Sequence, residues 1–166
     1  CGVVGYLGHD PELWNDTVEA NVLCGSDGRA MDYLKRTCLD EEVNDMEAGM
    51  QTVVGSSAVR LSGGQAQRLA LARTLAHPRP LLVLDDPFSA LDRDTEDAIF
   101  EALKQSSPGS ILFLISHRLY HFPELDKVAF MDGGKVTVGT HQELLASCPD
   151  YRTLYEGQTG GKRHEA

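Results

Sequence analysis

Two short apolar runs, each ending in polar residues, form the clearest pattern in the sequence. Residues 81–84 are continuously apolar and stop at Asp85-Asp86-Pro87, and residues 111–115 stop at Ser116-His117. Runs of this length with such boundaries are typical of strands buried on both faces of a parallel sheet. The pattern therefore predicts a strand buried on both faces at 81–84 and a second apolar strand at 111–115.

Helical patterns flank the first of these strands. Leu61-Ser62-Gly63-Gly64-Gln65 opens a strong helix that reaches about Ala76, and Ser62 and Gln65 have the spacing of a capping box. This helix is apolar over most of its surface, which predicts burial. A second helix is predicted over 92–105, because acidic residues fill its first turn, where the helix dipole favours them.

Weaker patterns predict the remaining elements. Helices are expected over 15–23 and 31–39, and a hairpin is expected from 128–131 into 135–138. A second capping box, Thr140 and Glu143, predicts a further helix, and the polar end from Gly157 is expected to fray. Strands that alternate with helices predict an α/β domain.

Composition and charge restrict the function classes. Hydrophobic residues make up 42% of the 166 residues and charged residues 24%, which predicts a folded globular chain. Acidic residues number 25 against 15 basic ones, so a nucleic-acid partner is not expected. No apolar run approaches the roughly 18 residues of a membrane span. We therefore expect a soluble domain.

The cysteines indicate the redox compartment, and the first residue indicates a longer parent protein. The cysteines (Cys1, Cys24, Cys38 and Cys148) show no C-x-x-C pairing. Free thiols in a reducing compartment are favoured over a disulfide framework or a zinc site. The chain starts at Cys1 instead of Met and shows no signal peptide, so we expect a fragment of a longer protein.

The polar strand ends are candidates for chemistry. Ligands bind beyond the carboxyl ends of parallel strands, where Asp85, Asp86 and His117 could hold a metal-bound phosphate and its attacking water. The alternatives are a turn or cap for the two acids and a hydrogen-bonded structural role for the histidine. Ser62-Gly63-Gly64 is either a simple helix start or an anion site made of exposed N–H groups.

Taken in order, these pieces resemble the nucleotide-binding domain of ATP-binding cassette (ABC) transporters. Residues 61–65 match the ABC signature, and residues 81–86 look like a Walker B strand. The other matching segments are the D-loop-like Ser89-Ala90-Leu91-Asp92, the switch histidine His117, the Q-loop-like residues 4–11, and residues 139–145 and 151–155, which resemble the end of exporter-type cassettes.

The resemblance implies an α/β P-loop NTPase fold with a mostly parallel sheet core and a helical signature subdomain. The Walker A pattern G-x-x-x-x-G-K-[ST] does not occur, so the first strand and the Walker A helix are expected to be missing from this fragment. The implied division is a Q-loop remnant with the helical signature subdomain over 1–76, an α/β core over 77–156 and a tail over 157–166.

The resemblance also implies that two cassettes enclose ATP between them. Asp85 would position Mg²⁺, Asp86 would act as general base, and His117 would contact the γ-phosphate. Asp92 would couple the two sites. His9, at the glutamine position of the Q-loop, would sense both nucleotide and membrane partner, although a neutral surface substitution is the alternative.

The signature would act on the other cassette. Ser62, Gly63 and Gly64 would bind the γ-phosphate of ATP held by the partner, and Gln65 would support that loop. The implied partners are a second nucleotide-binding domain, in a homo- or heterodimer, and a transmembrane domain. The implied location is the cytoplasmic face of the membrane.

Two residues depart from the family pattern. His9 replaces glutamine, and Asp86 replaces the usual catalytic glutamate, shortening its reach by roughly 1.5 Å, where a misplacement near 1 Å costs about a hundredfold in rate. We therefore expect a subunit that completes its partner's site and hydrolyses ATP poorly at its own.

The fragment alone is expected to be inactive, with exposed sheet edges and marginal solubility. The alternatives to a transport ATPase are a soluble ABC-type ATPase acting in DNA repair or on ribosomes, and a non-catalytic regulatory module.

Overall fold

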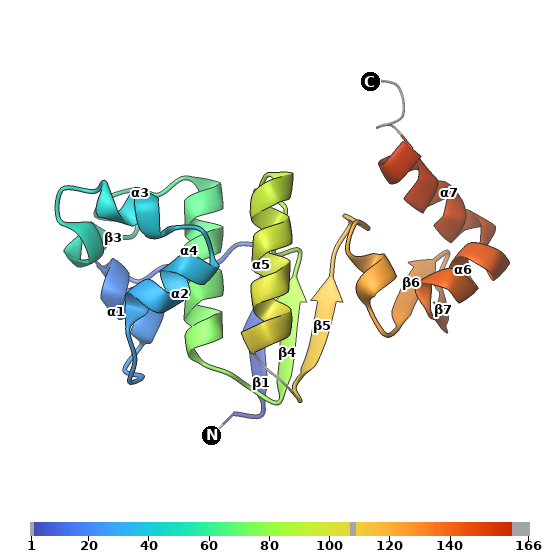
Figure 1. The fold of residues 1–166 in the computed structure, drawn as a ribbon, viewed down its shortest axis with the longest axis horizontal. Helices are drawn as coiled ribbons and strands as arrows, with labels where there is room; N and C mark the ends of the chain where they lie inside the picture. Colours follow the sequence, from blue (N-terminus) through green and yellow to red (C-terminus); the bar gives the residue numbers. More distant parts are fainter. Residues whose placement is uncertain (1, 107–108, 161–166) are drawn as a thin grey trace. The chain divides into compact units, whose positions relative to one another are not determined.

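The computed structural model describes residues 2–106 and 109–160. The chain divides into two compact units, Cys1–Ser116 and His117–Ala166. The first unit contains a parallel sheet with helices, and the second contains a hairpin with two helices (Figure 1). The functional division predicted at 76/77 and 156/157 stays a prediction.

The sheet of the first unit has the strand order β1-β4-β5. Its strands are β1 (Val4–Leu7), β4 (Leu81–Asp85) and β5 (Ile111–Ile115), and both pairings are parallel. The carboxyl ends of the three strands therefore lie along one edge of the sheet, where the candidate acids follow β4. The predicted strands at 81–84 and 111–115 are confirmed, and β1 is an addition to them.

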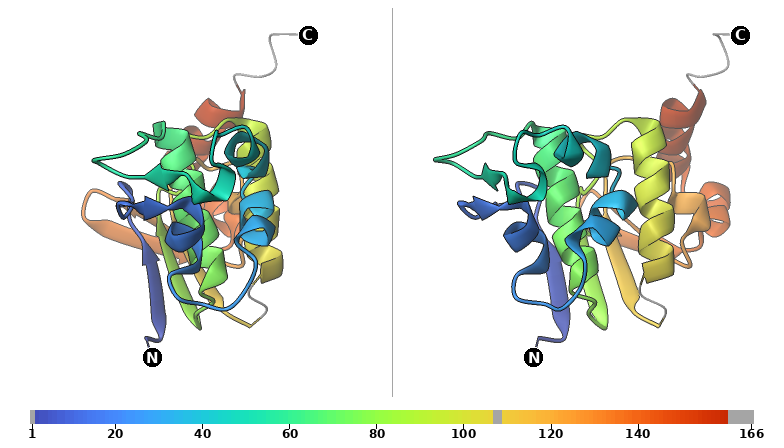
Figure 2. Two further views of the ribbon diagram at one scale, coloured as in Figure 1. Left: turned by 90° about the vertical axis from the view of Figure 1, so that its left-hand side faces the viewer. Right: turned by 60° about the vertical axis from the view of Figure 1, so that its left-hand side comes forward.

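Helices cover one face of this sheet. The helices α4 (Gly63–Ala76) and α5 (Arg93–Ser106) lie on that face (Figure 2), where Leu82 and Leu84 of β4 are buried. The exposed apolar residues of β1 and β5 are Val4, Tyr6, Ile111, Phe113 and Ile115. The burial on both faces expected for 81–84 is met only in part, because Leu82 and Leu84 are buried whereas Leu81 and Val83 are half-buried.

A helical layer packs against α4. Its helices are α1 (Val18–Leu23), α2 (Ala30–Arg36), α3 (Asp40–Asn44) and the 3₁₀ helix η1 (Gly49–Gln51), joined by the short strands β2 (Asp16–Thr17) and β3 (Val53–Val54). Val18, Val22, Leu34 and Leu69 belong to its core. The burial of α4, predicted from its apolar surface, is confirmed.

Two predicted helices are shorter than expected. The helix predicted over 15–23 begins at Val18, because Asp16–Thr17 pairs with β3 as a strand. The helix predicted over 31–39 ends at Arg36, because Cys38 adopts a left-handed conformation with φ of 52° that interrupts the helix.

The second unit confirms the predicted hairpin and capping box. It contains η2 (Phe122–Glu124), the hairpin strands β6 (Val128–Asp132) and β7 (Lys135–Gly139), and the helices α6 (His141–Ser147) and α7 (Pro149–Thr159). Thr140 caps α6 together with Glu143. The fraying expected from Gly157 is wrong as far as Thr159, where α7 ends; residues 161–166 lie outside the described part.

Three further observations complete the fold. Cys24, Cys38 and Cys148 are free thiols, and Cys1 lies outside the described residues. Over residues 2–106 and 109–160, no helix has both the length and the apolar character needed to cross a bilayer. The predicted α/β class with a parallel sheet core is confirmed.

Candidate nucleotide-binding site

Two carboxylates follow each other at the end of β4. Asp85 is the last residue of the strand, and its Oδ2 accepts a hydrogen bond of 3.3 Å from the hydroxyl of Tyr6 on β1. Asp86 is buried and has a left-handed backbone with φ of 49°. Its N–H donates to the carbonyl oxygen of Ile115 at 2.7 Å, next to the parallel pairing of β4 with β5. The neighbouring strands therefore fix the direction of both acids.

His9 lies beside the second of these acids. It follows β1 by two residues, and its Nδ1 lies 3.5 Å from Oδ2 of Asp86. The histidine side chain is 56% exposed, whereas that of Asp86 is 13% exposed. The structure thus brings together two residues that the sequence placed 77 positions apart.

Ser62 begins α4 through a complete capping box. Its Oγ accepts a hydrogen bond from the backbone N–H of Gln65 at 3.2 Å, and its own N–H donates to Oε1 of Gln65 at 2.9 Å. Ser62 and Gly63 are exposed. The predicted capping box is confirmed, and it presents the serine at the surface.

A partly buried network of hydrogen bonds supports the start of α4. Nε2 of Gln65 donates to Oε2 of Glu42 at 2.7 Å, and Nη2 of Arg68 contacts Oε1 of Glu42 at 2.5 Å. Arg68 also donates to the carbonyl oxygen of Cys38. Burial opposes ionisation of Glu42, but hydrogen bonds from Gln65 and Arg68, with the charge of Arg68, lower its pKa below the ordinary value.

The start of α4 lies against the segment that joins β4 to α5. A Cβ atom added to Gly64 would stand 3.0 Å from the carbonyl oxygen of Ala90 and 3.9 Å from a methyl of Leu91. This contact requires glycine, since a larger side chain would push the two segments apart. The predicted signature and the D-loop-like segment are therefore neighbours in space.

Asp92 has a structural partner. Its carboxylate accepts hydrogen bonds from the backbone N–H of Thr95 at 3.0 Å and from the Thr95 hydroxyl at 2.7 Å. These hydrogen bonds lower the pKa of Asp92, the backbone one having the largest effect. Asp92 therefore caps the first turn of α5, whatever its role toward a second cassette.

His117 belongs to the second unit. Its side chain is exposed, and its backbone oxygen accepts a hydrogen bond from Nε2 of Gln158 on α7 at 2.7 Å. The meeting of His117 with Asp85 and Asp86 stays a prediction from the sequence.

Some residues near the site were not foreseen. Tyr6, Glu42 and Arg68 take part through contacts that link segments 23 to 79 positions apart. No local spacing signals such contacts, so the sequence offered no pattern that would have identified them.

The carboxylate of Asp85 suits a magnesium ion that is held mainly by phosphate. In the part of the chain described, no three His, Cys, Asp or Glu side chains are grouped to hold a metal. Magnesium sites with nucleotides commonly use one or two carboxylates together with phosphate oxygens and water. Asp85, a partly buried carboxylate oriented by Tyr6, fits that role.

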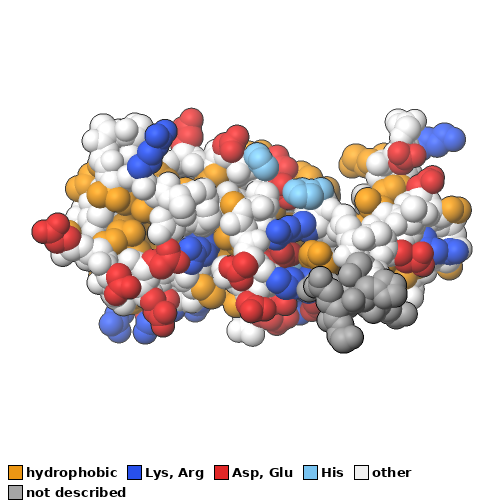
Figure 3. Space-filling model, turned by 90° about the horizontal axis from the view of Figure 1, so that it is seen from above, with side chains coloured by type: hydrophobic (Ala, Val, Ile, Leu, Met, Phe, Trp, Pro, Cys, Tyr) orange, Lys and Arg blue, Asp and Glu red, His pale blue; other side chains and the backbone are white. Residues whose placement is uncertain are grey.

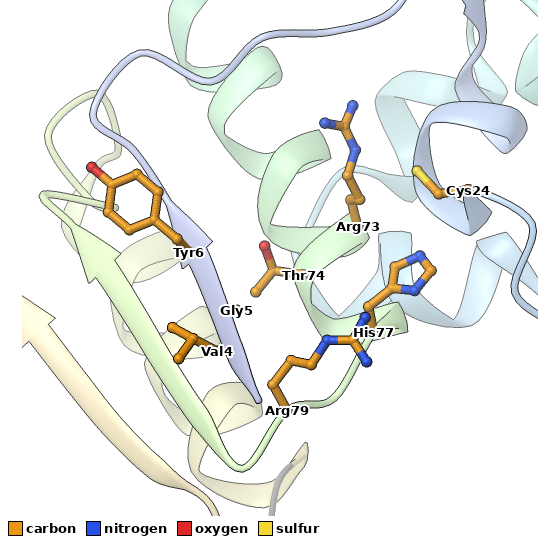
Figure 4. Close-up of a pocket in the computed structure, with 8 residues that line it drawn as sticks. All are labelled: Val4, Gly5, Tyr6, Cys24, Arg73, Thr74, His77 and Arg79. Atoms are coloured by element: carbon orange, nitrogen blue, oxygen red, sulfur yellow. The ribbon is translucent and has the colours of Figure 1, made fainter. Parts of the chain in front are cut away.

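A basic hollow lies on the other side of β1. Its volume is about 410 Å³, and Arg73, His77 and Arg79 line it next to β1 (Figure 4). The guanidinium of Arg73 is used internally, because it donates to Asn21 and to the backbone oxygen of Glu12. Asp85 and Asp86 do not line the hollow, but Tyr6, whose hydroxyl donates to Asp85, does.

The surface charges are mixed. On the face drawn in Figure 3, acidic and basic side chains are interspersed instead of gathered in one basic area.

Comparisons with known proteins show the family of the chain. A family model described as "ABC transporter" matches residues 2–89. A probable multidrug resistance ABC transporter ATP-binding/permease protein of Bacillus subtilis, YheI, is 37% identical over 162 residues, which cover 95% of this chain and 28% of the relative. An ATP-dependent lipid A-core flippase of Bordetella pertussis is 39% identical over 158 residues, covering 92% of this chain and 25% of the flippase.

A solved structure gives the same result. A bacterial Atm1-family ABC exporter with ATP bound has a TM-score of 0.86 and 30% identity, covering 95% of this chain and 29% of that one. The fold and the order of its polar segments thus define a nucleotide-binding domain of the P-loop class. The chain belongs to the ABC transporter family, and it spans about a quarter of the length of the relatives that it matches.

Proposed function

We propose that this chain is part of the ATP-binding and ATP-hydrolysing subunit of an ABC exporter. The observation that supports this most strongly is the close approach of the start of α4 to the Ala90-Leu91 segment, which is separated from Asp86 by Pro87, Phe88 and Ser89. The glycine-bearing start of α4 therefore packs against the same connection that follows Asp85 and Asp86 in the chain.

In this proposal the residues divide between two ATP molecules. Asp85 holds Mg²⁺, which neutralises phosphate charge, and Asp86 orients the attacking water and accepts its proton. His117 contacts the γ-phosphate of the same nucleotide. The phosphate-cradling Walker A loop, which these 166 residues lack, is supplied by another part of the complete protein.

The signature serves a second cassette. The exposed Ser62 and the N–H groups at the start of α4 face the γ-phosphate of ATP held by that partner. Gln65 keeps the serine in place through the capping box, and Asp92 links the two sites. A transmembrane domain is the further partner, and the cassette lies at the cytoplasmic face of the membrane.

We further propose that the two sites differ in rate. Asp86 is shorter than glutamate by one methylene, so the site it serves is slow, whereas the signature that this chain offers to its partner is complete. A non-catalytic module is the alternative, because the departures at His9 and Asp86 both fall in this chain's own hydrolytic set.

The test uses the complete protein, assembled with its partner cassette. ATP turnover is compared for the wild type, Asp86→Glu and Asp86→Asn. We expect Asp86→Glu to raise turnover and Asp86→Asn to remove a minor fraction of it. If turnover is unchanged in Asp86→Glu and collapses in Asp86→Asn, the site is fully active and the asymmetry is wrong.

A binding measurement separates the remaining alternatives. Wild-type complete protein is titrated with ATP and Mg²⁺, with and without the partner. Absence of ATP binding in both states would contradict the proposed function. Binding without any hydrolysis that depends on Asp86 would favour the non-catalytic module.

A further inference from the structure

The contact between His9 and Asp86 joins two loops at the edge of the sheet. β1 and β4 are parallel neighbours, with Leu7 opposite Leu84, so the residues that follow each strand emerge side by side. His9 comes from one of these loops and Asp86 from the other. Their separation of 3.5 Å, from Nδ1 to Oδ2, is a direct contact between side chains.

The two partners differ in freedom. Asp86 is held by its backbone, which is left-handed and donates to Ile115 of β5 at 2.7 Å, and its Oδ1 is buried. His9 is more than half exposed. The imidazole therefore approaches Oδ2, the carboxylate oxygen other than the buried Oδ1.

Stability is a poor explanation for this contact. A pair with one half-exposed partner contributes little to folding, because water screens it. Contacts among catalytic groups are often long before substrate binds and tighten in the reacting complex. A separation of 3.5 Å at a candidate general base fits such a contact.

We propose that His9 is a positioning residue for Asp86 and that the two side chains act as one unit in ATP hydrolysis. With its Nδ1–H directed at Oδ2, the ring fixes the orientation of the short carboxylate toward the attacking water. This inference rests on the proposed function, since it assigns a role within the same hydrolytic site.

Coupling between the two residues is the first test. In the complete protein with its partner, single-turnover ATP hydrolysis is measured for the wild type, His9→Ala, Asp86→Glu and the double variant. The phase belonging to this site is the one that Asp86→Asn removes. We expect His9→Ala to slow this phase about tenfold when residue 86 is the wild-type aspartate, and less than about twofold in the Asp86→Glu background.

Two further variants test the physical reason. His9→Asn replaces the ring nitrogen by an amide donor at the same distance from the backbone, so it should recover most of the lost rate. His77→Ala removes a histidine at the far end of α4 and should leave the phase unchanged. The effect should appear in kcat with KM unchanged, because positioning acts on the reacting complex.

A second readout needs no nucleotide. Amide hydrogen exchange is followed over residues 8–13 of the complete protein without ATP. His9→Ala and Asp86→Ala should each speed exchange about threefold, and the double variant should add nothing, because either change breaks the same contact. His77→Ala is again the control.

The outcomes are distinguishable. Additive effects on the rate, within about twofold, in a protein that hydrolyses ATP would overturn the positioning role alone. Unaltered hydrogen exchange in both single variants would also overturn it. If the exchange effects of His9→Ala and Asp86→Ala are coupled but the wild-type protein hydrolyses no ATP, the contact is supported and the proposed function is overturned.

Discussion

The start of α4 and the end of β4 hold their polar side chains in different ways. Ser62 and Gln65 bind each other, and Glu42 extends their network from a nearby helix. Asp85 and Asp86 instead contact Tyr6 and His9, which belong to another strand and its loop.

The geometry at the start of α4 is set by nearby residues, whereas the orientation of Asp85 and Asp86 depends on distant ones. The capping box forms wherever an α-helix starts with this sequence, and α4 is anchored in the core by residues such as Leu69. The acids depend on side chains nearly 80 positions earlier, so a change at Tyr6 or His9 can alter their chemistry while the fold persists.

The largest change is expected when a buried residue of α4 is truncated. Leu69 on α4 is 0% exposed, and Leu69→Ala should lower the free energy of unfolding by about 2–5 kcal/mol, because it leaves a cavity between α4 and the helical layer. Chemical denaturation of the complete nucleotide-binding domain measures it. Leu154→Ala, at a position that is 43% exposed, is the matched control, and equal losses would contradict the assigned core.

A somewhat smaller effect is expected at the end of β4, where Tyr6 orients Asp85. Tyr6→Phe removes the 3.3 Å hydrogen bond to Asp85 without changing the ring. Residues that orient a metal ligand are typically worth about 10–100-fold, and for this exposed bond we expect the Mg²⁺ requirement for hydrolysis to rise about tenfold. Measured Mg²⁺ dependence that matches the wild type would show that Tyr6 does not orient the carboxylate.

Ser62→Ala tests the capping box at the start of α4. The variant loses the acceptor for the Gln65 N–H, which should cost about 1 kcal/mol in the free energy of unfolding. Ser62→Thr keeps a hydroxyl and should lose much less. If the two variants unfold at the same denaturant concentration, the hydroxyl does not cap α4 in solution.

The smallest effect is a pH dependence of the same network. The pKa of Glu42 is lowered from 4.5 in the folded protein, so its ionised form stabilises the fold above that value. This contribution is lost as the pH falls below 4.5 and through the lowered pKa. Unfolding midpoints between about pH 6 and about pH 3 should therefore fall less steeply in Glu42→Gln than in the wild type.

The sequence predicted the elements that depend on neighbouring residues. The capping boxes at Ser62 and Thr140, the strand over 111–115 and the hairpin after Val128 all follow from short-range spacing, and the structure confirms them. These features were accessible because each is decided within a few residues.

The features that were missed depend on distant residues. β1 is only four residues long and includes Gly5, so its strand pairing with β4, 77 positions later, gave no local signal. The apolar run 81–84 suggested two covered faces, but Leu81 and Val83 are only half-buried, because whether a face is covered depends on the elements that pack there. The contact of His9 with Asp86 depends on the same parallel pairing.

The left-handed backbone at Asp86 bears on how substitutions there are interpreted. Aspartate and asparagine tolerate this conformation better than residues with longer side chains, because their short polar groups can hydrogen-bond locally. An exchange for glutamate thus lengthens the acid and also disfavours the turn on which it stands. The rate gained by the longer reach of glutamate in Asp86→Glu is therefore measured together with the conformational cost of the left-handed turn.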